Sequence, residues 1–198
     1  MSARSDQRRQ LRARRRALSA RERMRRSHAL SRQLSRQPMF RTANRIAAYL
    51  AQDGEVETLP LIELCWSMGK QVYLPVLVPF VENRLWFARY RPDTRLVRNR
   101  YGIAEPEVVH RERIDAHALD LVLAPLVGFD RNGNRLGMGG GFYDRSFAFL
   151  LGRKRWHKPQ LVGLAYDFQQ LLSLPPRPWD VPLAAVATDA GWYGFKHS

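Results

Sequence analysis

The chain has 198 residues, of which 45% are hydrophobic and 26% charged, a composition typical of a folded globular protein and not of a disordered one. Its one cysteine excludes a disulfide within the chain, and no apolar stretch approaches the roughly 20 residues that a membrane helix needs. The formal net charge is +15, but no apolar segment follows the basic N-terminus, which argues against a secretory signal. We therefore expect a cytoplasmic protein that folds as a single α/β domain over residues 1–198.

The positive charge is concentrated at the N-terminus. Residues 1–36 hold thirteen Arg but only Asp6 and Glu22 as acids, so this segment carries +11 of the net charge of +15. Such a segment is typical of helices that bind an anion, or of an arm that binds nucleic acid. No aromatic residue precedes Phe40, whereas RNA-binding segments bring exposed aromatic side chains. We therefore favour anion binding and expect no nucleic acid as the primary partner.

Two helices are expected at the N-terminus, one at residues 5–18 and one from Ser19 to about Gln37. Ser19 and Glu22 form a capping-box pattern, in which the serine oxygen accepts the Glu22 amide and the carboxylate reaches back. Pro38 ends the second helix, because the residue before a proline disfavours the helical conformation. Residues 1–37 are thus expected to form a basic helix pair that contributes to a binding site.

An apolar run at residues 45–51 is bounded by polar turns and is predicted to be a buried strand. The polar loop 52–58, with the sequence QDGEVET, follows it. Thr58 is expected to cap a helix that ends at Gly69. Cys65 lies in the apolar part of this helix, so we interpret it as a small core residue and not as a reactive thiol.

The rest of the chain alternates between predicted strands and helices. The segments 72–77 and 85–90 are predicted to pair as a hairpin through a tight turn at 82–83, and residues 91–118 are expected to be irregular. The remaining predicted elements are a strand at 120–124, a helix at 142–151, a strand at 161–166, a helical turn at 169–172, a strand at 184–188 and a stretch at 192–195 that packs the C-terminus against the core.

This alternation predicts an α/β fold with a mostly parallel sheet. Ligands of such folds bind beyond the carboxyl ends of the strands. The loop 52–58 and the glycine-rich segment 130–141 both follow predicted strands. Both are therefore expected to border one cleft.

The segment 136–145, LGMGGGFYDR, carries the strongest functional signal. Four glycines in five positions leave the backbone amides unshielded and free to adopt positive φ, so successive N–H groups can point at one anion. Arg135 and Arg145 flank the loop and can neutralise phosphate oxygens, and Asp144 can bind Mg²⁺. The segment predicts the phosphate-binding loop of an ATP-using enzyme.

Alternatives to this interpretation stay open at this point. The loop lacks the Lys-Ser/Thr of a Walker loop, and Phe142 stands where a dinucleotide fingerprint needs a small residue. A glycine-rich turn without a ligand, or a different ATP-using enzyme on the same scaffold, would give the same pattern. The five histidines are scattered without the spacing of a metal site.

The run DLVLAPLVGFDRNGNRLGMGGGFYDR, residues 120–145, closely resembles the signature of the 5-formyltetrahydrofolate cyclo-ligases, also called methenyltetrahydrofolate synthetases. The resemblance extends over essentially the whole chain. Further segments that agree with the family, and in its order, are ARRRALS at 13–19, GEVET at 54–58, YGIAEP at 101–106 and WDVPLAAVAT at 179–188.

The resemblance implies a three-layer α/β fold of the NagB/RpiA/CoA-transferase-like kind. It also implies an ATP-dependent conversion of 5-formyltetrahydrofolate to 5,10-methenyltetrahydrofolate, in which the formyl oxygen first attacks the γ-phosphate and ADP and phosphate are released. Such chemistry needs positioning and charge stabilisation more than a nucleophilic side chain. The implied partners are small molecules, and the protein is expected to be a monomer that binds no membrane.

The resemblance also assigns the reacting groups. Tyr143 and Arg145 are the candidate catalytic residues, and Asp144 matches a Mg²⁺ ligand. Ala184 stands where some family members have a metal-binding Asp, so the second ligand is open, with Asp189 as the nearest substitute.

Two binding half-sites are implied as well. Glu55 matches the carboxylate that grips the pterin, and a carboxylate can accept two donors from the amino and ring N–H groups. Arg12 can share the phosphates with the ATP-binding residues, since it lies one turn beyond them. The ATP-binding residues are Arg4, Arg8, Arg135, Leu136, Gly137, Met138, Gly139, Gly140, Gly141, Phe142 and Tyr143, and the folate-binding residues are Leu50, Glu55, Tyr101, Met138, Gly139, Gly140, Gly141 and Phe142.

Overall fold

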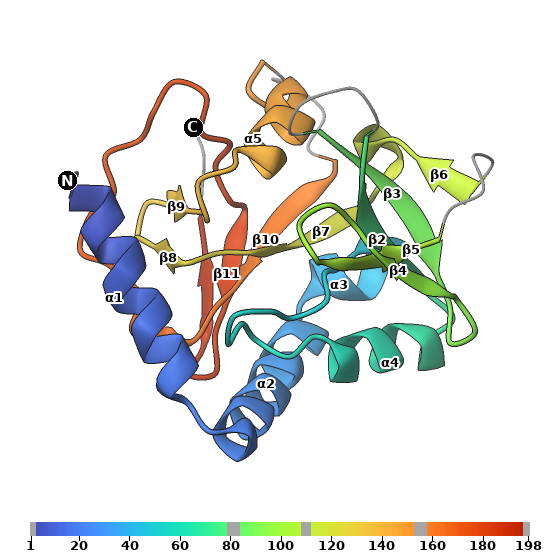
Figure 1. Cartoon of the computed structure of the whole chain (residues 1–198), viewed down its shortest axis with the longest axis horizontal. Helices are drawn as coiled ribbons and strands as arrows, with labels where there is room; N and C mark the ends of the chain where they lie inside the picture. The colour runs from blue at the N-terminus through green and yellow to red at the C-terminus, as the bar shows by residue number, and fades with distance from the viewer. Residues whose placement is uncertain (1–2, 79–83, 108–111, 153–157, 196–198) are drawn as a thin grey trace.

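The structure, a computed structural model, describes residues 3–78, 84–107, 112–152 and 158–195. Within these residues one eight-stranded sheet runs in the order β12-β11-β10-β7-β1-β2-β3-β6 (Figure 1). The strands from β11 to β2 are parallel, and antiparallel strands complete the sheet at both ends. The strand bounds are β1 Arg45–Ala47, β2 Gln71–Leu77, β3 Leu85–Tyr90, β6 Arg113–Ile114, β7 Leu121–Pro125, β10 Gln160–Leu164, β11 Ala185–Ala187 and β12 Trp192–Gly194.

Two small hairpins lie outside this sheet. They pair β4 (Leu96–Arg98) with β5 (Ala104–Pro106), and β8 (Gly128–Phe129) with β9 (Arg135–Leu136). The helices are α1 Ala3–Ala17, α2 Ala20–Ser35, α3 Pro38–Thr42, α4 Leu59–Ser67 and α5 Phe142–Phe147, and the short 3₁₀ helices are η2 Ala116–Ala118, η3 Ala148–Leu150 and η4 Asp167–Gln169.

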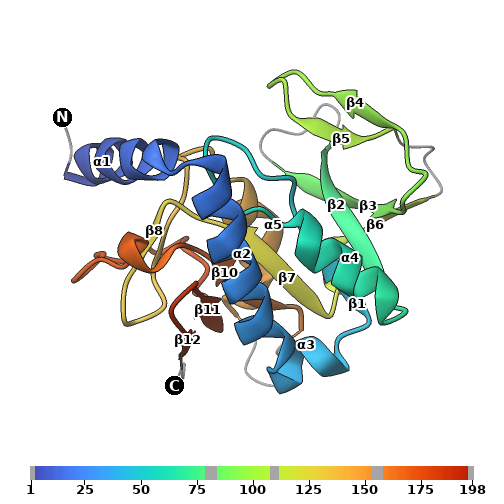
Figure 2. The ribbon, with the colours of Figure 1, turned by 90° about the horizontal axis from the view of Figure 1, so that it is seen from below.

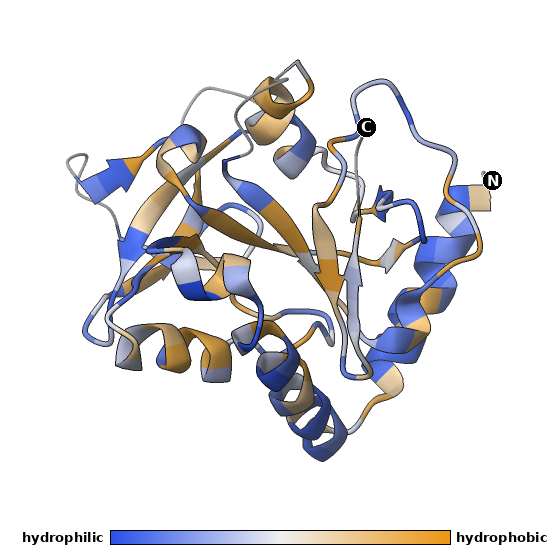
Figure 3. Ribbon diagram, turned by 180° about the vertical axis from the view of Figure 1, so that it is seen from behind, coloured by the Kyte–Doolittle hydropathy of each residue, from blue (hydrophilic) through white to orange (hydrophobic). Residues whose placement is uncertain are grey.

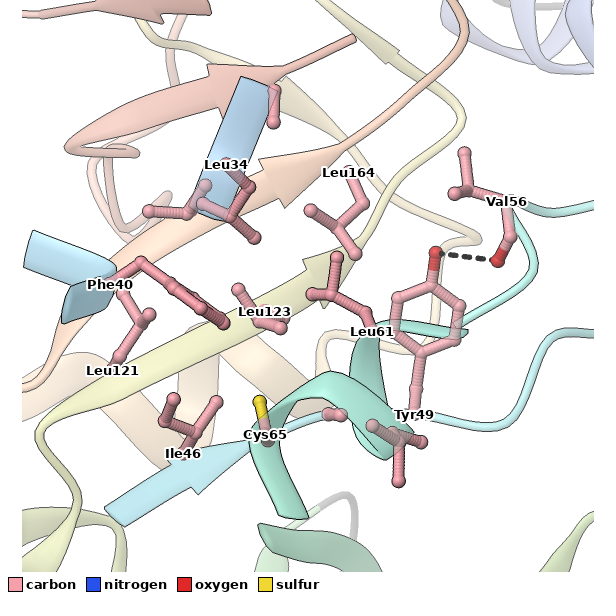
Figure 4. Close-up of a cluster of buried hydrophobic side chains, with 14 of the residues drawn as sticks. Leu34, Phe40, Ile46, Tyr49, Val56, Leu61, Cys65, Leu121, Leu123 and Leu164 are labelled. Carbon is pink, nitrogen blue, oxygen red and sulfur yellow. Dashed lines mark hydrogen bonds between the residues drawn. The ribbon is translucent and has the colours of Figure 1, made fainter. Parts of the chain in front are cut away.

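Helices cover both faces of the sheet. Helices α2, α3 and α4 lie on one face, as the view from below shows (Figure 2). On the opposite face, Phe147 of α5 packs against β7 and β10 together with Ala116 and Leu119, which follow β6. Successive strand residues alternate between the two cores, so Leu121 and Leu123 face α3 and α4 while Val122 faces α5. The first core, drawn in Figure 4, includes Leu34, Phe40, Ile46, Leu61, Cys65, Leu121, Leu123 and Leu164.

The expected mixed α/β fold with a mostly parallel sheet is confirmed by this topology. Both halves of the predicted capping box are present, because Ser19 Oγ accepts the Glu22 amide at 3.3 Å and the Ser19 amide donates to Glu22 Oε2 at 3.1 Å. Cys65 is 1% exposed, and burial raises the pKa of its thiol to about 12, which confirms a core residue. Figure 3 shows hydrophobic strands inside and largely hydrophilic α1 and α2 outside.

Several local predictions were wrong. Strand β1 ends at Ala47. The Ala48 amide still donates to the Tyr73 carbonyl of β2 at 2.9 Å, and the next two residues, Tyr49 and Leu50, line a cavity instead of continuing the strand. Thr58 makes no capping bond. Its hydroxyl donates to the Tyr49 carbonyl instead, which joins the two ends of the loop between β1 and α4.

The other corrections concern short elements. Residues 91–118 are not simply irregular, since they contain β4, β5 and β6. The helical turn lies at 167–169, and helix α5 gives way to η3 after Phe147. The expected packing of 192–195 against the core is confirmed, and Trp192–Gly194 also form the edge strand β12. The predicted turn at 82–83 lies outside the described residues. Across the part of the chain that the structure describes, no helix combines the length and apolar character needed to cross a membrane.

Candidate functional site

A cavity of about 470 Å³ lies beyond the carboxyl ends of β1, β2 and β7. The loop after β1 supplies Leu50 and Glu55, and the glycine-rich loop supplies residues 137–141. The loop of the β4–β5 hairpin brings Tyr101, and α1 brings Arg4 and Arg8. The two loops expected to border one cleft do so. The loop with Glu55 follows the parallel strand β1, whereas the glycine-rich loop follows the small β8–β9 hairpin that comes after β7.

The glycine-rich loop runs from β9 into α5 with its backbone exposed to the cavity. Gly139 and Gly141 adopt positive φ, at 109° and 68°, which other residues adopt only with strain. A side chain at Gly141 would also meet Arg145 Nη1 at 2.9 Å. Helix α5 covers only six residues, so the loop amides, and not a long helix dipole, are the groups available to an anion.

Positive charge surrounds this loop. Arg8 Nε donates to the Gly137 carbonyl at 2.8 Å, and Arg4 Nη2 donates to the Pro175 carbonyl at 2.5 Å. Arg177 lines the same end of the cavity. Burial, together with the neighbouring charges of Arg4 and Arg177, lowers the pKa of Arg8. An anion placed here would relieve the repulsion between these guanidinium groups.

Two carboxylates lie at the same end of the cavity. Arg135 Nη2 donates to Asp144 Oδ1 at 2.5 Å, and the Val181 amide donates to the same oxygen at 3.2 Å. Asp180, the residue before Val181, lines the cavity and accepts Arg4 at 3.2 Å. Among the described residues, no three His, Cys, Asp or Glu side chains gather to hold a metal by themselves. The pair nevertheless fits Mg²⁺, which binds one or two carboxylates, substrate phosphates and water.

Asp189, the nearest substitute for a second metal ligand, does not reach this place. Asp189 accepts Arg26 Nη1 at 2.5 Å and the Asp167 amide at 2.8 Å, and it does not line the cavity. Ala184, where the metal-binding Asp is missing, directly precedes β11 and donates its amide to the Leu161 carbonyl of β10. Asp180 was missed at the sequence level, because only the contact of its loop with α1 brings it to the cavity.

The other end of the cavity is largely apolar and includes the mostly buried acid Glu55. Tyr101 contacts Phe142 edge to face, with 5.9 Å between ring centroids, and Leu50 lines the wall. The Glu55 side chain is 12% exposed, and its Oε2 accepts the Gln52 amide at 3.2 Å. Burial raises the pKa of Glu55 to about 7, against the opposing effect of Arg15. Glu105 also lines the cavity, but its Oε2 already accepts the Leu77 amide at 3.3 Å and Asn99 Nδ2 at 3.0 Å. A largely apolar slot with carboxylates at its wall suits a flat ring system that carries N–H donors.

The predicted catalytic residues occupy different positions. Tyr143 lines the cavity, and burial raises the pKa of its hydroxyl, so it stays protonated at neutral pH. Arg145 is exposed and donates from Nη1 to the Gly140 carbonyl at 3.0 Å, without lining the cavity. Leu136 packs in the core against Leu11, so only its backbone faces the loop.

Two further residues were missed by sequence reasoning. Arg15 is 1% exposed, and its Nη2 donates to Asp53 Oδ2 at 2.9 Å. The signal was present, because Arg15 lies one turn after Leu11 on the buried side of α1, but a run of arginines hid it. Trp179, 58% exposed at the mouth of the cavity, lies in a proline-rich segment without periodicity.

Comparison with known proteins gives one consistent family. The sequence model of the 5-formyltetrahydrofolate cyclo-ligase family matches residues 1–189. A cyclo-ligase of Escherichia coli is 43% identical over 178 residues, which cover 90% of this chain and 96% of the relative. One of Haemophilus influenzae is 47% identical over 145 residues, which cover 72% and 74%.

Solved structures agree with this. The NMR structure of Aquifex aeolicus 5,10-methenyltetrahydrofolate synthetase aligns with a TM-score of 0.81 at 31% identity, covering 100% of this chain and 95% of that one. The fold is also shared with a 5,10-methenyltetrahydrofolate synthetase from Mycoplasma pneumoniae, at a TM-score of 0.72 and 23% identity.

Proposed function

The chain belongs to the 5-formyltetrahydrofolate cyclo-ligase family, and we propose that its cavity performs the family reaction through a phosphorylated formyl group. The reaction is the ATP-dependent conversion of 5-formyltetrahydrofolate to 5,10-methenyltetrahydrofolate. The observation that carries the proposal is the shape of the cavity, which joins a basic, glycine-lined end to a largely apolar end that holds the mostly buried carboxylate of Glu55. The first end fits a triphosphate and the second fits a reduced pterin.

The proposed chemistry proceeds in two steps. The formyl oxygen attacks the γ-phosphorus, the bond from that phosphorus to the bridging oxygen breaks, and ADP leaves. The carbon, now part of an iminium phosphate, is attacked by the folate nitrogen at position 10, which loses its proton. The carbon–oxygen bond then breaks and phosphate leaves. Phosphorylation is needed because an unmodified formyl oxygen is a poor leaving group.

The residues of the cavity have proposed roles in this sequence. The amides of residues 137–141, with Arg4 and Arg8, bind the phosphates, and Arg135 balances the charge of the bound nucleotide. Arg145 is proposed to stabilise the transferred phosphoryl group after its guanidinium leaves the Gly140 carbonyl. Tyr143, protonated at neutral pH, is proposed to donate a hydrogen bond to the reacting oxygens.

Mg²⁺ is proposed to accompany the nucleotide, since it neutralises phosphate charge in phosphoryl transfer. Asp144 would hold it, with Asp180 as the second carboxylate, because both line the cavity and Asp144 accepts the amide of Val181, the residue after Asp180. The bond between Asp144 and Arg135 would then loosen as phosphate oxygens replace the carboxylate partner of Arg135. We further propose a cytoplasmic monomer.

The proposed function is tested by mixing the purified protein with 5-formyltetrahydrofolate and Mg²⁺ and following the absorbance of methenyltetrahydrofolate. Product is expected with ATP and not without it, with ADP and phosphate released in equal amounts. A folded protein that yields no product with ATP would contradict the function. Isotopically labelled formyl oxygen is expected in the released phosphate, and its absence there would contradict the phosphorylated intermediate alone.

Glu55→Ala is expected to raise the KM for 5-formyltetrahydrofolate by about 100-fold and that for ATP by less than about threefold. The expected size corresponds to about 3 kcal/mol, typical of losing a charged hydrogen-bond acceptor for two donors. Initial rates with each substrate varied in turn give both constants. Glu57→Ala, in the same loop but outside the cavity, is the matched control. An effect of Glu55→Ala on ATP alone would reverse the assignment of the half-sites.

The KM for 5-formyltetrahydrofolate is expected to rise as the pH falls below about 7, where the Glu55 carboxyl becomes protonated. The protonated form loses its charge, so binding is expected to weaken by up to about tenfold per pH unit. KM is measured between about pH 6 and pH 8, and a pH-independent KM in Glu55→Gln identifies the group. The same pH dependence in wild type and Glu55→Gln would contradict the assignment. Glu55 interacts electrostatically with five other titratable or charged groups, which are Tyr49, Asp53, Tyr143, Arg12 and Arg15.

A further inference from the structure

Helix α1 takes part in both ends of the cavity. Its first turns carry Arg4 and Arg8, which line the basic end. Its last turns carry Arg12, Arg15 and Arg16, which contact the loop 52–57 that presents Glu55. The helix lies beside the sheet and next to the β8–β9 hairpin, as Figures 1 and 2 show. One rigid element therefore connects the two half-sites.

Three arginines of α1 meet on one carboxylate, an arrangement we call the loop clamp: Asp53 with Arg12, Arg15 and Arg16. Arg12 Nε donates to Asp53 Oδ2 at 2.7 Å and Arg15 Nη2 to the same oxygen at 2.9 Å. Arg16 Nε donates to the other oxygen, Oδ1. Without Asp53 these guanidinium groups would repel one another and lose their shared acceptor. The clamp therefore holds the loop on the helix.

The backbone of the loop fits closely against α1. Asp53 has a φ of 52°, an uncommon conformation for a residue with a side chain. At Gly54, with a φ of 74°, an added Cβ would lie 2.9 Å from the carbonyl carbon and oxygen of Arg15. This strained turn and close approach persist only while surrounding contacts hold them. The loop is thus shaped to dock on this helix.

Arg15 extends the clamp to the folate end. Its Nη1 donates to the Leu126 carbonyl at 3.1 Å and lies 3.6 Å from Glu55 Oε1. The guanidinium therefore contacts the segment after β7, the clamp carboxylate and the proposed pterin-binding acid. Its Nε has no hydrogen-bond partner within the described part of the chain. The cost of burying the Arg15 charge is therefore offset mainly by its contacts with the Asp53 and Glu55 carboxylates.

Helix α1 itself is weakly attached to the core. Leu11 and Arg15 are the residues of this helix that are buried. Its other contacts are largely hydrogen bonds of partly exposed arginines, such as Arg4 with the Pro175 carbonyl and Arg8 with the Gly137 carbonyl. Phosphates bound at Arg4 and Arg8 would fix the helix further, and a pterin bound at Glu55 would fix the loop.

We propose that the loop clamp couples the two half-sites, so that a nucleotide bound at one end of α1 strengthens folate binding at the other end, and the reverse. This rests on the proposed function. The physical reason is that each ligand orders part of a shared unit, so the second ligand finds it already ordered. Arg15 and Asp53 act as positioning residues, since they hold Glu55 and α1 together without touching the reacting atoms.

The test is calorimetric titration of the whole protein with 5-formyltetrahydrofolate, with and without a non-hydrolysable ATP analogue and Mg²⁺, and the same titration in the reverse order. Wild type is expected to bind each ligand at least about fivefold more tightly when the other is present, by the same factor in both orders. Failure to bind either ligand would contradict the proposed function. Tight but independent binding, with a factor of one, would overturn the coupling alone.

Variants locate the coupling in the clamp. Asp53→Asn and Arg15→Met are expected to bring the factor close to one, whereas Asp53→Glu restores part of it. Arg16→Gln removes a partner that is 57% exposed, so it keeps the fold and is expected to give an intermediate factor. Arg9→Gln, in the exposed pair with Asp6 on the same helix, is the control with unchanged coupling. The proposal would be overturned if Arg16→Gln and at least one of Asp53→Asn and Arg15→Met kept the full wild-type coupling factor.

A pH readout separates positioning from a general loss of structure. Arg15 favours the ionised form of Glu55, so its removal is expected to raise the pKa of that carboxyl further. Arg15→Met should therefore weaken folate binding by more at pH 7 than at about pH 9, where Glu55 is ionised in both proteins. An equal loss of affinity at both pH values would contradict this role of Arg15.

Discussion

Asp144→Ala is expected to lower kcat by about 10²- to 10³-fold, a loss of about 3–4 kcal/mol in transition-state stabilisation. Asp144 carries the proposed metal contact, and its carboxylate accepts Arg135 and the Val181 amide at the basic end of the cavity. Its loss would misplace both the cation and the arginine during phosphoryl transfer. Initial rates at saturating ATP and folate measure the effect, and the Mg²⁺ concentration that gives half-maximal rate is expected to rise.

Stability must be separated from catalysis in this variant. The Arg135 side chain is 5% exposed, so alanine at position 144 leaves a buried cation without its acceptor. Asp144→Asn is the matched control, since the amide oxygen can still accept a hydrogen bond while the negative charge is gone. It should keep the wild-type melting temperature within a few degrees and still lose most of kcat. An Asn variant with nearly normal kcat would show that Asp144 has only a structural role.

Arg145→Ala is expected to lower kcat by about 10²-fold or more, with a small change in the KM for either substrate. Stabilising charge on a transferred phosphoryl group acts in the transition state and not in the bound substrate, so the loss appears in kcat. Arg145 is exposed and donates only to the Gly140 carbonyl among the bonds described for it, so the fold should tolerate alanine. The variant is compared with wild type by steady-state kinetics and circular dichroism.

A conservative variant sharpens this prediction. Arg145→Lys keeps the charge but not the planar fork of donors, so it should recover only part of the lost rate. A rise in the KM for ATP with an unchanged kcat would instead mean that Arg145 shapes the glycine-rich loop in the ground state. Such a role in the loop would follow from the packing of Arg145 on the loop backbone. Its Nη1 lies 2.9 Å from the position that a Cβ at Gly141 would occupy.

Elements with strong local patterns could be predicted from the sequence. Helices α1 and α2 and strands β2, β7 and β10 have continuous periodicity or apolar runs, and the Ser19 capping box is a local signal. The small hairpins could not be predicted in the same way. The β4–β5 hairpin contains Arg98 and Glu105 among its few residues, so its pairing depends on tertiary contacts and not on a hydrophobic alternation.

The candidate site shows the same division. The loop with Glu55 and the glycine-rich loop could be expected at one cleft, because each was predicted to follow a strand of a parallel sheet. The β8–β9 hairpin that stands between β7 and the glycine-rich loop was not predicted. The partners of Arg15 could not be predicted: its place one turn after Leu11 indicates a buried position, but nothing local shows that it meets Asp53 and Glu55 and not another acid. Asp180 was missed because a contact across the chain with Arg4, and no local pattern, brings it to the cavity.

The slight attachment of α1 has a consequence for heat inactivation. A helix that buries only Leu11 and Arg15 can open at a lower free energy than the sheet, whose cores lie under helices on both faces. Such an opening would carry away Arg4 and Arg8 and release the Asp53 turn at once. The protein would then lose its activity while most of its secondary structure was still folded, so its working temperature would be set by its periphery and not by its core.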